Sequence, residues 1–154
     1  EALLRVGDAY AKLWRRPELD PTYGQSALAT YQELISRYPE SEPAKAAAQR
    51  IAALHDKFAL KEFQAAKYYL RYKAYDSAIL YLKDLVVNYP RAAIVPEALA
   101  RMVEAYRSLG YQEDMQETCG YLRKYHPDAT DAIKSCAGVA APAATAGTPP
   151  APGS

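Results

Sequence analysis

The side chains best suited to chemistry in this chain are two cysteines and two histidines. Cys119 and His126 are seven residues apart, close to two helical turns, so they would lie on the same face of one helix. A cysteine beside a histidine is the arrangement that activates a thiolate nucleophile. Seven residues correspond to about 10 Å along a helix axis, however, which is too far for proton transfer. The spacing therefore argues against a catalytic pair.

Other sequence signatures of catalysis or metal binding are missing. The chain has no glycine-rich phosphate loop, no serine elbow, no HExxH motif and no paired-cysteine ligand spacing. His126 falls in register with Tyr38 and Tyr89, which also precede prolines, so we expect it to be structural. The sequence predicts a protein that is not an enzyme and that uses no metal and no cofactor.

Cys119 and Cys136 are the only cysteines in the sequence. Cys119 occupies a position where neighbouring repeats should pack, and Cys136 lies in the segment expected to cover it. In an oxidising compartment the two could form a disulfide that pins this segment. The alternative is that both are small buried apolar residues with free thiols.

The elements that carry these residues follow a repeat. Tyr69, Ala78, Leu82, Leu85 and Pro90 recur thirty-seven residues later as Tyr106, Met115, Cys119, Leu122 and Pro127, and a degenerate copy runs from Ala27 to Pro39. An aromatic residue, a small or soft residue, an apolar residue and a helix-ending proline at this spacing are typical of tetratricopeptide repeats. The sequence thus predicts an all-α solenoid of antiparallel helix pairs, a fold whose surface generally binds other proteins.

The helices of this solenoid can be assigned from apolar periodicity, caps and prolines. We expect helices over about 2–15, 20–38, 42–73, 76–89, 94–109 and 112–125, followed by a short capping helix over 128–137. The third of these is unusually long because no proline or glycine interrupts it. The resulting units are about 1–40, 41–90 and 91–127, a cap over 128–138, and an alanine- and proline-rich tail over 139–154 that we expect to be disordered.

Composition limits the class of partner. The chain has 154 residues and a formal net charge of +1, which argues against nucleic acid because nucleic-acid binding usually needs a concentrated basic face. Fourteen tyrosines outnumber the two phenylalanines and one tryptophan, and we expect most of these rings to pack between helices. No apolar run reaches the length that spans a bilayer. The chain opens at Glu1 inside a helical pattern, without methionine or signal peptide, which indicates a piece of a longer protein.

Three segments, in this order and spacing, resemble the BamD family, the tetratricopeptide lipoproteins of the β-barrel assembly machine. They read ELISRYPES from Glu33, AKYYLRYKAYDSAI from Ala66 and PEALARMVEAYRSLG from Pro96. The resemblance covers about 14–127 and suggests the carboxy-terminal half of such a protein. Two features depart from the family pattern: the lipid-bearing amino-terminal cysteine is absent, and the tail has no counterpart.

The resemblance implies a non-catalytic scaffold on the periplasmic side of the outer membrane, a subunit of the BAM complex. Its carboxy-terminal repeats would dock on the POTRA region of the barrel-forming subunit, next to other assembly-machine lipoproteins. The membrane would be reached only through an amino-terminal lipid anchor. One alternative is another periplasmic or cytosolic repeat adaptor for a cell-envelope or secretion complex. The other is an accessory domain of an enzyme whose catalytic part lies outside this sequence.

The partner should meet the first helix of each repeat, which lines the concave face. Counting from Tyr69 and Tyr106, the side chains expected in this groove are Phe63, Lys67, Leu70, Arg71, Glu97, Glu104 and Arg107. Charges of both signs with scattered apolar residues suit a protein surface. Two alternatives remain open: these charges are simply the solvated face, or the partner uses the convex face.

Overall fold

The computed structural model describes residues 1–141, and this part of the chain contains helices and no strands. The helices are α1 (Ala2–Leu13), α2 (Thr22–Arg37), α3 (Glu42–Arg71), α4 (Tyr75–Asn88), α5 (Val95–Leu109), α6 (Gln112–Tyr125), α7 (Thr130–Ile133) and a 3-10 turn, η1 (Lys134–Cys136). The expected all-α solenoid is confirmed. The expected tail falls mostly on residues 142–154, which lie outside the described residues.

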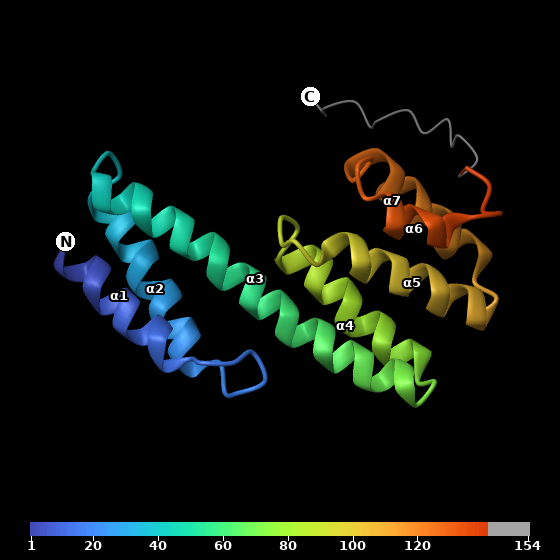
Figure 1. Cartoon of the computed structure of the whole chain (residues 1–154), viewed down its shortest axis with the longest axis horizontal. Coiled ribbons are helices and arrows are strands. Elements are labelled where there is room, and N and C mark those ends of the chain that lie inside the picture. Colours follow the sequence, from blue (N-terminus) through green and yellow to red (C-terminus); the bar gives the residue numbers. More distant parts are fainter. Residues whose placement is uncertain (142–154) are drawn as a thin grey trace, which may run out of the picture.

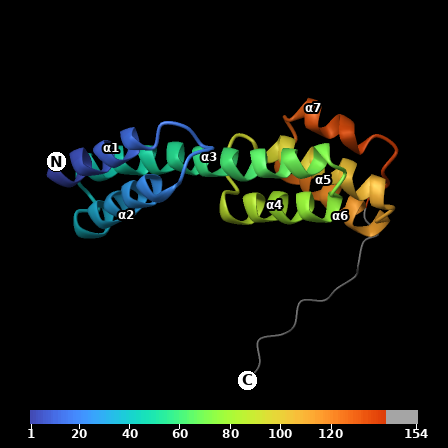
Figure 2. The ribbon, with the colours of Figure 1, turned by 90° about the horizontal axis from the view of Figure 1, so that it is seen from below.

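Successive helices pack against each other in pairs, and α3 connects the two ends of the rod (Figure 1). Its first half packs with α1 and α2, and its second half packs with α4. Seen from below, α1 and α3 lie along one side, and α2, α4 and α6 lie along the other (Figure 2). The first helix of a pair and the second helix therefore lie in different layers, and α7 lies over the end of the rod that α5 and α6 form.

Two hydrophobic clusters hold this rod together. The first cluster is built from α1, α2 and the first half of α3 around Trp14, Tyr31 and Phe58. The second is larger and is built from the end of α3 and all later elements. The long helix serves both because its buried face changes between Phe58 and Ala59, adjacent residues that belong to different clusters and point in different directions around the helix.

The helix ends follow the expected signals with small shifts. Ser41 accepts a hydrogen bond from the backbone N–H of Ala44, and Gly110 ends α5 in the left-handed conformation with φ 75°. Asp20 accepts from the backbone N–H of Thr22 at 2.8 Å, so it caps α2 from just outside the helix. Helix α1 ends at Leu13 instead of near residue 15 because Trp14 turns inward and is only 1% exposed.

The expectation that most tyrosine rings pack between helices is wrong. Only Tyr31 and Tyr106 are buried, whereas eight of the fourteen tyrosines are exposed. Several exposed rings sit where a helix starts or stops, such as Tyr38, Tyr72 and Tyr111. At these positions the chain is turning between layers, so the ring lies beside the repeat interface and keeps its hydroxyl in water.

None of the helices within residues 1–141 has both the length and the apolar character needed to cross a bilayer.

Gly24 is expected to be intolerant of a methyl group. A Cβ at this position would lie 2.7 Å from Cζ3 of the buried Trp14 ring. We expect Gly24→Ala to lower the free energy of unfolding by about 1–3 kcal/mol through overpacking, after any gain in helix propensity. Urea denaturation measures the change. Gln25→Ala is the matched control, since Gln25 is the exposed next residue on the same helix and should be neutral or slightly stabilising.

Candidate protein-binding groove

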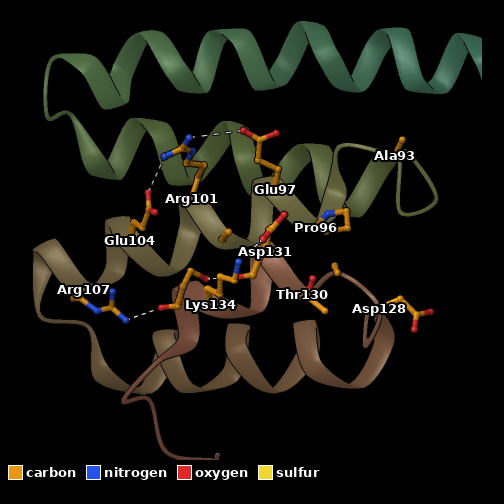
Figure 3. A pocket seen from close by; sticks show the side chains of 14 residues that line it. Ala93, Pro96, Glu97, Arg101, Glu104, Arg107, Asp128, Thr130, Asp131 and Lys134 are labelled. Carbon is orange, nitrogen blue, oxygen red and sulfur yellow. Dashed lines mark hydrogen bonds and ion pairs between the residues drawn. The ribbon is translucent and has the colours of Figure 1, made fainter.

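A groove lies between α5 and the segment that caps the solenoid. One wall is the exposed face of α5, where Glu97, Arg101 and Glu104 follow each other at helical spacing. The other wall is the cap, residues 128–135. The cavity between them is about 760 Å³ (Figure 3). Polar and apolar side chains both line it, so its surface suits another protein's side chains.

Ion pairs organise the charges on both walls of this groove. Arg101 lies between two carboxylates, 3.8 Å from Glu97 and 3.1 Å from Glu104. On the cap, Lys134 pairs with Asp131 at 2.6 Å, which lowers the pKa of the Asp131 carboxyl below its ordinary value through a hydrogen bond. All of these side chains are well exposed, so each pair contributes little to stability.

The structure brings Glu97, Glu104 and Arg107 together along this groove (Figure 3). Arg107 has a further role that its spacing did not indicate. Its Nη2 donates to the carbonyl of Ser135 at 2.7 Å and lies 3.5 Å from that of Ala137. Arg107 therefore holds the cap against α5, and a substitution there would disturb the groove wall as well as any partner contact.

The four positions expected on α3 have different environments. Phe63 is 4% exposed and belongs to the second cluster, so its expected place in the groove is wrong. It points inward because it continues the buried stripe that includes Ala59 and Ala66. Leu70 is half-buried against the same cluster. Only Lys67 and Arg71 are exposed to a partner, and the Lys67 ammonium lies 5.8 Å from the Phe63 ring centroid.

The cap itself differs from the single helix expected over 128–137. It consists of the four-residue α7 and the three-residue η1. Segments this short are not stable by themselves, so the cap depends on its contacts with the solenoid. Val139, expected in the tail, is 8% exposed and packs in the second cluster, so the folded part extends beyond residue 138.

A disulfide between Cys119 and Cys136 joins α6 to the end of the cap. The two Cα atoms are 5.7 Å apart, within the range that a disulfide spans, and both side chains are at most 1% exposed. Arg123 of α6 adds hydrogen bonds to the carbonyls of Cys136 and Val139 at 3.1 and 3.2 Å. The wall of the groove is thus fixed from α5 by Arg107 and from α6 by Arg123 and the disulfide.

Sequence reasoning missed several residues of this site. Arg101 could have been found, because it lies four residues after Glu97 and three before Glu104 on an expected helix. Asp131 and Lys134 have the same helical spacing within the cap. Arg123 gave no such signal, since its partners are backbone carbonyls of a segment without periodicity.

Across residues 1–141, no three histidine, cysteine, aspartate or glutamate side chains gather closely enough to hold a metal ion. Stacked helix pairs, a charged open groove and a covered end define this chain as a helical repeat protein of the tetratricopeptide type.

Comparison with known proteins assigns a family within this class. The family model described as "YfiO: Outer membrane lipoprotein" matches residues 3–121. Three similar curated proteins are each called outer membrane protein assembly factor BamD. That of Vibrio cholerae is 32% identical over 103 residues, which are 67% of this chain and 43% of the relative. That of Caulobacter vibrioides is 33% identical over 67% of this chain and 34% of the relative. That of Xylella fastidiosa strain 9a5c is 34% identical over 68% of this chain and 36% of the relative.

The chain therefore belongs to the YfiO family, which includes BamD, and the resemblance noted in its sequence is confirmed. The matched region spans less than half the length of each of these relatives.

Proposed function

We propose that this chain is a docking module of an outer membrane protein assembly factor. In this role it binds a protein partner and performs no catalysis. The observation that carries the proposal is an open groove with charges of both signs, walled by α5 and a cap, in a member of a family whose relatives are named assembly factors. The partner of the proposal is the POTRA region of the barrel-forming subunit, on the periplasmic side of the outer membrane.

The chemistry of the groove supports a protein ligand. Its carboxylates come from α5 and the cap, and its cations include Arg101 and Lys134, already paired within each wall. A partner with complementary charges can replace one member of each ion pair, and breaking the pair costs little free energy because exposed ion pairs are individually weak. Such surfaces set specificity and association rate more than affinity. The exposed Lys67 and Arg71 on α3 would extend the contact beyond α5.

Charge reversal on the groove tests this proposal. We expect Glu97→Lys combined with Glu104→Lys to weaken binding to a purified POTRA-containing subunit by tenfold or more, since like charges placed opposite each other cost several kcal/mol. Surface plasmon resonance measures the affinity, and circular dichroism confirms an unchanged melting temperature. Arg71→Glu should have a smaller effect in the same direction. Arg107 is avoided because it holds the cap.

Lys124→Glu is the matched control, an exposed charge reversal on α6, outside the groove. Equal affinities of wild type, the α5 variant and this control would remove the groove from the interface. If the α5 variant keeps its fold but loses a different envelope protein captured from membranes, the chain is an adaptor for another complex.

A further inference from the structure

A second groove, separate from the one between α5 and the cap, lies between α1 and α3. Its cavity is about 510 Å³, and its floor is apolar, formed by Ala11, Ala53 and Leu54. Three cations surround this floor, Lys12 from α1 and Arg50 and Lys57 from α3, against the single carboxylate of Asp8. The groove therefore has an excess of positive charge beside apolar surface.

Arg50 is oriented toward this groove by its neighbours. Its Nε donates to Asp8 Oδ1 at 2.5 Å, and the same oxygen accepts from the Tyr31 hydroxyl at 2.6 Å. Tyr31 is 1% exposed, so the carboxylate is fixed from below by a buried group. Within residues 1–141 the two terminal nitrogens of Arg50 make no hydrogen bond or ion pair. A guanidinium fixed through Nε with both terminal nitrogens unused is suited to a bidentate carboxylate.

The ionisation of this network is favourable at neutral pH. Partial burial raises the pKa of Asp8, but the hydrogen bonds from Tyr31 and Arg50 outweigh it and leave the pKa below its ordinary value. Asp8 thus stays charged and keeps Arg50 in place. Lys57 lies with its ammonium 4.7 Å from the Trp14 ring centroid and donates to the Trp14 carbonyl, and burial lowers its pKa. An arriving carboxylate would stabilise the charged form of this lysine.

We propose that the α1–α3 groove binds an acidic segment of a protein, with an aspartate or glutamate side chain on Arg50 and Lys12 and a neighbouring apolar side chain on Leu54. The charge excess selects the carboxylate, and the apolar floor selects a peptide over a small free anion. This binding does not depend on the docking proposed for the α5–cap groove, because different helices and different residues form the two sites.

A peptide-binding assay on the whole chain tests this inference. The probe is a fluorescein-labelled peptide in which aspartate alternates with leucine and alanine, blocked at both ends so that it has no terminal carboxylate. We expect this peptide to bind about tenfold more tightly than the same peptide with asparagine in place of each aspartate. The reason is that a hydrogen bond to a charged group strengthens binding by about tenfold or more. Fluorescence anisotropy at two salt concentrations should show weaker binding at the higher one.

Substitutions separate this groove from general charge attraction. Arg50→Gln should weaken binding of the aspartate peptide about tenfold and remove its advantage over the asparagine peptide. Lys12→Gln should weaken it about threefold and leave the hydrogen bonds of Asp8 to Tyr31 and Arg50 in place. Arg5→Gln is the control, since it removes the same charge from an exposed part of α1 outside the groove. Binding should be unchanged in this control.

Four results would overturn the inference. The first is equal affinity for the aspartate and asparagine peptides, which would mean that only apolar contacts hold the peptide. The second is that Lys12→Gln and Arg50→Gln bind the peptide like the wild type, and the third is that Arg5→Gln loses as much affinity as they do. The fourth is binding to vesicles of phosphatidylglycerol that depends on Arg50, without binding of the peptide, which would assign the groove to a membrane surface.

Discussion

Replacing both Cys119 and Cys136 with alanine is expected to lower the free energy of unfolding by about 3 kcal/mol. The disulfide closes a loop of 17 residues, and releasing a loop of this size restores about that much conformational freedom to the unfolded chain. Since α7 and η1 are too short to persist alone, the loss should be concentrated at the cap. The wall of the α5–cap groove should therefore loosen, and affinity for a partner bound there should fall.

Guanidinium denaturation of oxidised and reduced protein measures this effect, with a thiol titration in denaturant to count free cysteines. The unreduced protein should show no titratable thiol. The double alanine variant serves as the control, since its stability should not respond to reductant. Two titratable thiols in unreduced protein, or equal stability with and without reductant, would contradict the expectation and favour two buried free cysteines.

Trp14→Ala is expected to have an even larger effect, lowering the free energy of unfolding by about 3–5 kcal/mol. Trp14 lies just after α1 and is 1% exposed, and its ring centroid is 4.6 Å from that of Phe58. Its Nε1 donates to the carbonyl of Leu19 at 3.4 Å and so also supports the connection to α2. Alanine would remove the largest side chain of the first cluster and leave a cavity between α2 and α3.

Leu13→Ala is the matched control, because the preceding residue is 55% exposed and should change stability by about 0.5 kcal/mol or less. Hydrogen exchange should localise the loss of protection in Trp14→Ala to α1, α2 and the first half of α3, since the second cluster does not contain this residue. Equal loss of protection in α5 and α6 would mean that the two clusters unfold as one unit.

The groove between α5 and the cap illustrates how far sequence periodicity reaches. Helical spacing predicts Glu97, Glu104 and Arg107 on one face of the helix, and these three residues do line one groove. Counting from Tyr69 predicts Phe63 on the same surface, but Phe63 is buried. The count failed there because α3 is shared by two clusters and its buried stripe drifts around the helix over 30 residues.

Helical periodicity in the sequence does not predict contacts between segments that are distant along the chain. Arg107 and Arg123 bind backbone carbonyls of the cap, and a carbonyl has no residue-type signal. Asp8, Tyr31 and Arg50 come from three different helices, and only their packing joins them into one network. Sequence could suggest the Cys119–Cys136 pairing only as one of two alternatives, because a disulfide depends on the distance between chains.

The residues by themselves determined the helical repeat, the long α3, the helix-ending prolines and the family, because each of these depends on spacing along the chain. Tertiary structure alone decided which tyrosines are buried, how the cap is held, and where the two grooves open. The physical reason is that the periodicity of a helix is a property of its own local sequence. A groove is the space left between helices, and the approach of those helices depends on how all of their side chains pack together.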